Sequence, residues 1–340
     1  MMGAERREER RMESRRFGTT ALESSVIGFG TWPIGGARYG LSDDRDAIAA
    51  IHAALDAGIT CFDTAPTYGN GHAEELLGAA LGSRRPEVVI VTKGGLLWDE
   101  HSRVIGRNSS KQYLMSLIDD SLRRLNTDYV DLYLIHWPDP ATPMEEAMDA
   151  LEAIVRSGKA RYIGVSNFNS RRLREAEAAL TEQHLAANQV SFSLFDRRWQ
   201  RDTFDTCAEL GIGVMAYGVL AHGLLTGTFN RSTVFDHTDW RASGDFFGQA
   251  LLTPENFARN LDVVDRLKAI AARRAMILPQ LALAWVLSHE IVTVALVGAR
   301  NPAEVRDSAG AATVRLTAEE LQEIEAVMAV AAGTSTVLPQ

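Results

Sequence analysis

Short apolar runs alternate with amphipathic helical patterns through almost the whole chain, and this alternation constrains the fold more than any other feature. The apolar runs are rich in β-branched residues, which is typical of buried parallel strands. Strands that alternate with helices are joined by right-handed crossovers and form one parallel sheet. Eight such units favour an α/β fold closed into a (β/α)8 TIM barrel over an open, doubly wound sheet. The expected strands are residues 26–32, 60–64, 88–93, 130–136, 162–166, 188–193, 213–217 and 293–297.

The expected division of the chain is an N-terminal tail at residues 1–15, a single barrel domain at residues 16–333 and a C-terminal tail at residues 334–340. The tail at residues 1–15 alternates arginine with glutamate and has almost no apolar residues, which predicts disorder. Residues 16–26 are expected to form a hairpin that caps the barrel. Residues 94–108 are predicted as a long loop, and residues 222–254 as a polar, aromatic insertion.

Capping signals predict two helix starts. Thr142, Pro143 and Glu145 predict an N-cap, a proline at the first helical position and a capping-box acid. Thr317 and Glu320 predict a capped extra helix at the C-terminal end of the domain. Helical periodicity predicts further helices at residues 42–57, 73–81, 257–275 and 279–288, and another from residue 302.

Composition limits the class of protein. A chain of 340 residues with 46% hydrophobic residues can bury one large core. A net charge of −9 argues against nucleic acid or an anionic membrane as a partner. Cys61 and Cys207 are too few for a disulfide framework or a metal cluster, which fits a reducing compartment. No apolar run approaches membrane-spanning length and no signal-peptide pattern is present, so we expect a cytoplasmic protein.

Three consecutive strands end on side chains that can do chemistry. They end on Asp63, Lys93 and His136, and Tyr68 follows the aspartate by five residues. Taken singly, each has an ordinary structural explanation, such as a surface charge, a packing ring or a structural imidazole. The carboxyl ends of barrel strands meet on one face, where the reactive groups of such barrels lie. The recurrence over three strands therefore indicates an active site on that face.

At these strand ends the chain resembles the aldo-keto reductase family. The resemblance extends from about residue 16 to about residue 333 and is carried by FDTAPTYG (62–69), VTKGG (91–95), DLYLIHWPDP (131–140), YIGVSNFN (162–169) and AYGVLAHGLLTG (216–227). It implies a barrel enzyme that reduces aldehydes and ketones to alcohols, reversibly, by hydride transfer from a nicotinamide cofactor.

The resemblance also implies a role for each of the four side chains, which we call the tetrad. Tyr68 would donate a proton to the oxygen of the substrate as the general acid. Lys93 would lie beside it and lower its pKa, and Asp63 would hold the lysine in place. His136 would polarise the carbonyl group and orient it.

The cofactor is not expected on a Rossmann motif, because the glycines of residues 28–33 do not open a helix. The resemblance instead implies a dinucleotide that lies extended across the C-terminal face of the barrel. The residues expected to contact it are Gly30, Thr31, Trp32, Asp63, Ser166, Asn167, Gln189, Tyr217, Gly218, Val219, Leu220, Gly223, Leu225, Gly298, Arg300, Glu304 and Ser308.

Arg300 follows the last strand and precedes a helix N-terminus, an arrangement that suits a phosphate group. In the family this segment holds the adenosine 2′-phosphate, so NADP(H) is favoured over NAD(H). Glu304 and Ser308 depart from the residues usual in the family, and Gly218 replaces a frequent serine. NAD(H) therefore stays possible.

Aromatic residues at or near the strand ends are expected to wall the substrate pocket, and no arginine clamp for a phosphate or carboxylate stands out, so we expect an uncharged carbonyl compound. The expected pocket residues are Trp32, Tyr68, Trp98, His136, Trp137 and Phe168. Trp240, Phe246 and Phe247 in the insertion are expected to close over a ligand as a lid.

Two other functions stay open, and a third is disfavoured. The enzyme would act as an NAD(P)+-dependent dehydrogenase of a sugar or pyridoxal-type alcohol, or the chain would be a cofactor-binding regulatory subunit. A metal-dependent hydrolase is disfavoured, because only His136 and Asp63 could be ligands and Lys93 between them would compete with a cation. No metal is therefore expected. The expected partner is a small molecule, with no nucleic acid or membrane, and the chain would be a monomer or a homo-oligomer.

Overall fold

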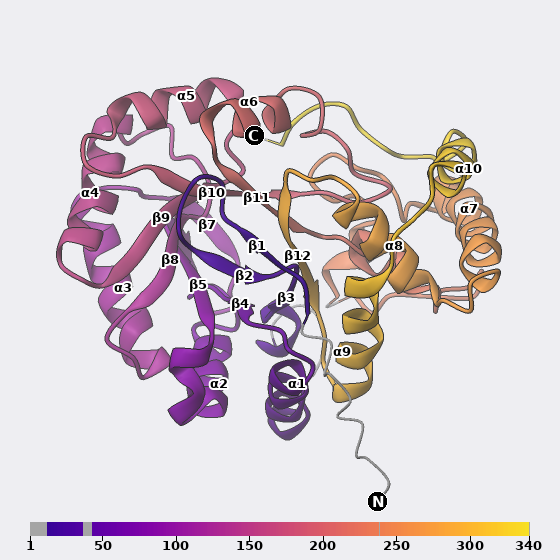
Figure 1. Ribbon diagram of the computed structural model, residues 1–340, viewed down its shortest axis with the longest axis horizontal. Helices are drawn as coiled ribbons and strands as arrows, with labels where there is room; N and C mark the ends of the chain where they lie inside the picture. Colours follow the sequence, from indigo (N-terminus) through magenta and orange to yellow (C-terminus); the bar gives the residue numbers. More distant parts are fainter. Residues whose placement is uncertain (1–11, 37–42, 238, 340) are drawn as a thin grey trace, which may run out of the picture.

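Eight parallel strands form a closed barrel in the computed structural model, which describes residues 12–36, 43–237 and 239–339 (Figure 1). The strands follow one another around the barrel in chain order, and the last pairs with the first. The predicted (β/α)8 barrel is therefore confirmed. The strands are β3 (Ile27–Gly30), β4 (Cys61–Asp63), β5 (Val89–Gly94), β8 (Val130–Ile135), β9 (Ala160–Ser166), β10 (Leu185–Ser191), β11 (Gly213–Tyr217) and β12 (Val292–Gly298).

Helices cover the outside of the barrel, as Figure 1 shows, and α1 packs against both α2 and α9 so that the ring closes. The outermost pair is α7 and α10, which pack on each other at one side. The helices are α1 (Asp44–Asp56), α2 (His72–Leu81), α3 (Lys111–Leu125), α4 (Met144–Arg156), α5 (Ser170–Ala179), α6 (Thr203–Leu210), α7 (Pro254–Ala272), α8 (Leu278–Leu287), α9 (Pro302–Ala309) and α10 (Ala318–Met328).

The core has two layers, because alternate residues of each buried strand point inward and outward. Inward side chains such as Val91, Leu132 and Met215 fill the barrel, and outward ones pack under the helices. Phe17 and Leu22 join the inner layer. They come from the turn of an N-terminal hairpin, β1 (Ser14–Arg16) and β2 (Glu23–Ser25), which caps the barrel as predicted.

This hairpin starts earlier than expected. Ser14 and Arg15 belong to β1, so the predicted tail at residues 1–15 is wrong for them, and residues 1–11 lie outside the described part of the chain. The side chain of Arg15 anchors this strand, because it donates to the backbone carbonyl groups of Leu287 and Val292 at 3.1 and 2.7 Å.

Two other local predictions need correction. The stretch predicted as a long loop contains a second hairpin, β6 (Leu96–Trp98) and β7 (Val104–Arg107). Helix α4 begins at Met144 with Pro143 as the N-cap, and not with Thr142. The hydroxyl of Thr142 donates to Asp139 at 2.6 Å instead. The box of Thr317 and Glu320 at α10 is confirmed, with reciprocal bonds of 3.2 and 2.8 Å.

Candidate active site

Asp63 and Lys93 form a buried ion pair at the C-terminal ends of neighbouring strands, β4 and β5. The Nζ atom of Lys93 lies 2.7 Å from Oδ1 of Asp63 and donates at 2.9 Å to the carbonyl group of Thr64. From the far side of the barrel, Gln189 on β10 donates its side-chain amide to Oδ2 of Asp63 at 2.7 Å. Both charges are therefore paired and hydrogen-bonded, which buried charges require.

Tyr68 reaches this pair from the tight loop between β4 and α2. Gly69 has a φ of +62°, and a Cβ atom there would lie only 1.9 Å from the carbonyl oxygen of Gly35, so this position requires glycine. The Nζ atom of Lys93 donates to the Tyr68 hydroxyl at 3.2 Å. The rings of Tyr68 and His136 meet edge to face, with centroids 6.0 Å apart. The structure thus brings the whole tetrad together.

The pKa of the Tyr68 hydroxyl is raised in this site, because burial disfavours the phenolate and the negative charge of Asp63 disfavours it further. The net shift in the free protein is therefore upward, opposite to the lowered pKa that was expected from Lys93. Asp63 lies against the ammonium group, so the phenol faces an ion pair and not a lone cation. A phenol that keeps its proton at neutral pH is suited to donate it.

Burial also governs the other three groups. It raises the pKa of Asp63 and lowers the pKa of Lys93, while the attraction between the two acts in the opposite direction on both. The pKa of His136 lies well below its usual range, first because of burial and second because of the charge of Lys93. A neutral imidazole donates from one ring nitrogen, so His136 can bond to an oxygen atom without itself being charged.

Three tetrad residues, Asp63, Tyr68 and His136, line a cavity of about 660 Å³. The cavity continues along the ends of β9, β10 and β11 to the end of β12. Many of the residues predicted for the cofactor line it: Gly30, Trp32, Ser166, Asn167, Gln189, Tyr217, Gly218, Val219, Leu220, Gly223, Gly298, Arg300 and Glu304. Such continuity suits an elongated ligand.

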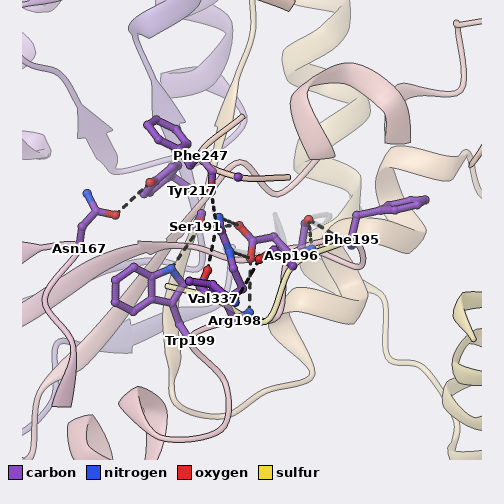
Figure 2. Close-up of polar contacts among 12 residues, drawn as sticks. Asn167, Ser191, Phe195, Asp196, Arg198, Trp199, Tyr217, Phe247 and Val337 are labelled. Atoms are coloured by element: carbon purple, nitrogen blue, oxygen red, sulfur yellow. Dashed lines mark hydrogen bonds and ion pairs between the residues drawn. The ribbon is translucent and has the colours of Figure 1, made fainter. Parts of the chain in front are cut away.

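The polar side of the cavity is fixed by its own hydrogen bonds. Ser166 donates its hydroxyl to the carbonyl group of Gln189 at 2.8 Å, and Asn167 donates its amide to that hydroxyl at 3.0 Å. Tyr217 donates its hydroxyl to the side-chain carbonyl of Asn167 at 3.0 Å, a bond also drawn in Figure 2. Asn167 has a φ of +61°, which this network holds in place.

Aromatic residues of the insertion cover the opposite side. The ring of Trp240 lies 5.3 Å from that of Trp32 and 4.2 Å from that of Phe246, measured between centroids. Phe247 lies 5.5 Å from Trp137. All five line the cavity, so the segment predicted as a lid lies where a lid would act.

The sequence model of the Aldo/keto reductase family matches residues 26–329. The chain belongs to the aldo-keto reductase family. It is accordingly an oxidoreductase that acts on carbonyl or alcohol groups with a nicotinamide cofactor. The match spans the barrel and the tetrad, in agreement with the resemblance of the motifs.

Several proteins resemble the chain over almost its full length. Aldo-keto reductase YhdN of Bacillus subtilis is 33% identical, over 93% of this chain and 94% of that protein. The NADH-specific methylglyoxal reductase of Escherichia coli K12 is 32% identical over 88% and 93%, and the L-glyceraldehyde 3-phosphate reductase of E. coli O157:H7 is 34% identical over 92% of each. The glycerol dehydrogenase AKR11B4 of Gluconobacter oxydans superposes with a TM-score of 0.84, at 35% identity, over 96% and 97% of the chains.

Besides Lys93, five residues predicted for the site of this aldo-keto reductase do not line the cavity: Thr31, Trp98, Phe168, Leu225 and Ser308. Phe168 and Leu225 are buried in the hydrophobic core, and Thr31 and Ser308 are also buried. Trp98 lies on β6. These residues are close to the site in the chain, but they do not contribute to the lining of the cavity.

The sequence reasoning also missed residues. His222, Arg107 and Arg241 line the cavity. His222 belongs to a recognised motif, which was a usable signal, whereas Arg107 lies in the hairpin that was predicted as a loop. No arginine clamp was expected from the sequence, whereas the structure places these two arginines in the cavity lining. Arg107 donates to the carbonyl group of Pro138 at 2.9 Å, and Arg241 pairs with Asp239 at 2.6 Å.

Across residues 12–36, 43–237 and 239–339, His, Cys, Asp and Glu nowhere gather in a group of three or more that could hold a metal ion. In the same part of the chain, no helix has the length and apolar character needed to cross a membrane.

Proposed function

We propose that this aldo-keto reductase reduces aldehydes and ketones to alcohols and that Tyr68 supplies the proton. One observation carries the proposal: the Tyr68 hydroxyl lies 3.2 Å from Nζ of Lys93, in a cavity that His136 also lines. Reduction of a carbonyl group places negative charge on its oxygen, and a positioned acid neutralises that charge.

The four side chains then have distinct tasks. His136 donates to the carbonyl oxygen and orients it, and Tyr68 transfers its proton to the same oxygen as charge develops there. The phenolate left behind is stabilised by the ammonium group of Lys93. Asp63 keeps that ammonium group charged and in place. Tyr68 is protonated at neutral pH, so the free enzyme already holds the proton that reduction requires.

The cavity suits a nicotinamide dinucleotide. Ser166, Asn167 and Gln189 offer hydroxyl and amide groups for a carboxamide. The backbone that follows β11 curls through positive φ at Gly218 (+66°) and Gly223 (+102°), and such concave backbone receives phosphate oxygens. When bound, the nicotinamide supplies the hydride.

The choice of dinucleotide rests on two residues. Arg300 favours NADP(H), because a guanidinium suits a phosphate group. Glu304 opposes it: its carboxylate accepts from the backbone N–H of Arg300 at 2.9 Å and lies 3.7 Å from the guanidinium. NADP(H) stays our expected cofactor, although one relative is named an NADH-specific reductase. Titrating the protein with NADPH and with NADH, followed by tryptophan fluorescence, tests this choice of cofactor. Tighter binding of NADPH supports the expectation, and tighter binding of NADH overturns it.

The substrate is proposed to be a small carbonyl compound. Arg241 is neutralised by Asp239, which supports an uncharged substrate, although relatives named L-glyceraldehyde 3-phosphate reductases carry a phosphate on theirs. Steady-state rates test the proposal, with NADPH and NADH, for 4-nitrobenzaldehyde, methylglyoxal and glyceraldehyde 3-phosphate, and in reverse for glycerol. Fast reduction supports the reductase. Faster oxidation of the alcohol favours a dehydrogenase, as the name of the structural neighbour suggests, and no hydride transfer to any carbonyl favours a cofactor-binding regulatory subunit.

A further inference from the structure

Arg198 is buried and fully paired just beyond the end of β10. Its guanidinium forms two parallel bonds with the carboxylate of Asp196, at 2.9 and 2.8 Å, and its side chain is 1% exposed. None of the steps proposed above uses this arginine. A buried bidentate pair fixes geometry as well as charge, because both planar groups must lie in one plane.

The pair is anchored to the barrel. Ser191, the last residue of β10, donates its hydroxyl to Oδ2 of Asp196 at 2.6 Å and accepts from the indole N–H of Trp199 at 3.2 Å. Trp199 is 1% exposed and belongs to the core. The carboxylate therefore has a fixed position relative to the strand that also carries Gln189, a cavity residue.

The remaining nitrogen of Arg198 joins two distant parts of the chain. Nη1 donates to the backbone carbonyl of Phe247 in the insertion at 2.5 Å, and to that of Val337 near the C-terminus at 3.3 Å (Figure 2). We call these segments, residues 245–249 and 335–339, the outer wall. They meet each other too, because Phe247 and Gly248 share a small hollow with Val337.

Phe247 needs such support. Its φ is +50°, a left-handed conformation that is rare and costly for a bulky residue. The side chain remains 46% exposed, so burial of its ring contributes little to holding this conformation. The ring nevertheless lines the cavity and packs against Trp137, next to the tetrad residue His136.

We propose that Arg198 is a positioning residue for the substrate: it holds the outer wall in place, so that Phe247 closes the cavity against Trp137. The C-terminal segment thereby supports the position of Phe247 from outside the cavity, through the same guanidinium. The effect on catalysis rests on the proposed function, whereas the effect on the position of the wall does not.

The experiment compares three variants of the full chain. Arg198→Lys keeps a positive charge but cannot bond to Asp196 and both carbonyl groups at once. Phe247→Ala keeps the backbone carbonyl groups and removes the ring. Arg201→Lys is the matched control, because Arg201 is an exposed arginine on the same stretch of chain. For each we measure hydrogen exchange of residues 243–252 and 331–339, the Kd of the dinucleotide, and kcat and KM for 4-nitrobenzaldehyde.

For Arg198→Lys we expect faster exchange in both segments and a KM raised about tenfold, with the dinucleotide Kd unchanged within about twofold. Phe247→Ala should raise KM similarly while residues 331–339 exchange as in the wild type, and Arg201→Lys should change nothing.

Unchanged exchange in Arg198→Lys overturns the proposal even if the enzyme proves inactive. Unchanged KM in Phe247→Ala overturns it even if Arg198→Lys does not fold. Faster exchange in a protein that reduces no carbonyl contradicts the proposed function alone.

Discussion

The pairing of Asp63 with Lys93 decides how the tetrad behaves at the scale of single residues. Both side chains are buried, and each is the main electrostatic compensation for the other. We expect Lys93→Met to destabilise the fold by about 3–5 kcal/mol, because it leaves a buried carboxylate unpaired. The double variant with Asp63→Asn should recover much of that stability without recovering activity. Denaturant unfolding and steady-state rates measure both, and a double variant no more stable than Lys93→Met would contradict the account.

His222 should make the fold acid-sensitive. Burial is the main cause that lowers its pKa to about 4, below the usual value near 6.5. The folded state therefore resists protonation of His222. The contribution of the neutral ring to stability is fully present above pH 6.5 and is lost as the pH drops from 6.5 towards 4. The loss is at most about 3 kcal/mol, and smaller to the extent that water reaches the ring. His222→Gln should flatten this part of the stability profile. Thermal unfolding at a series of pH values measures this loss of stability. An equal loss in the wild type and in His222→Gln would show that other groups cause it.

Glu304 should weaken the binding of a 2′-phosphate through like-charge repulsion near Arg300. We expect Glu304→Gln to lower the Kd of NADPH roughly threefold to tenfold and to leave that of NADH nearly unchanged, since the side chains are partly exposed and screened. The amide keeps an oxygen that can accept from the backbone N–H of Arg300. Equal changes for both dinucleotides would mean that Glu304 only holds the turn of Arg300 and Asn301 before α9.

At the scale of elements, the loop between β4 and α2 is what places the phenol. We expect Gly69→Ala to lower kcat about a hundredfold, because the added Cβ displaces the loop from Gly35 and moves Tyr68 by an ångström or so. Gly82, at the end of α2, is a matched control: it also has a positive φ, but a Cβ there meets nothing within 4 Å. Similar kcat values for Gly69→Ala and Gly82→Ala would contradict this role of the loop.

Elements whose residues are buried by a regular pattern could be predicted from the sequence, and others could not. β5 and β8 are fully buried runs, so the functional residues at or just after their ends, Lys93 and His136, followed directly. The hairpin of β6 and β7 escaped because Val104 and Ile105 are half exposed or more, which gives no burial pattern. Thr142 failed as a cap because Asp139, three residues earlier, competes for its hydroxyl.

Side-chain direction was the main limit for the site. Positions at strand ends identified the tetrad, because every barrel strand delivers its last residues to one face. Phe168 follows Asn167, yet it is packed in the core, since the left-handed conformation of the asparagine turns the chain at that point. The raised pKa of Tyr68 could not be predicted either, because it depends on burial and on the charge of Asp63 near the phenol.

At the scale of the whole molecule, ring closure brings the two ends of the site together. β12 pairs with β3, so the segment of Arg300 and the loop of Trp32 both border one cavity, although they are far apart in the sequence. The alternation of strand and helix patterns in the sequence was enough to predict that the barrel closes. It did not predict that the C-terminal segment reaches the insertion through Arg198, because that contact depends on two backbone carbonyl groups.

The most direct test of the account is to remove the Tyr68 hydroxyl and measure reduction and dinucleotide binding on the same protein. Tyr68→Phe is compared with Tyr129→Phe, which alters a tyrosine just before β8, at the other end of the barrel. The account predicts that kcat for 4-nitrobenzaldehyde falls about 10²- to 10⁴-fold in Tyr68→Phe alone, while the dinucleotide Kd stays the same. A Tyr68→Phe protein that reduces the aldehyde at close to the wild-type rate would contradict it.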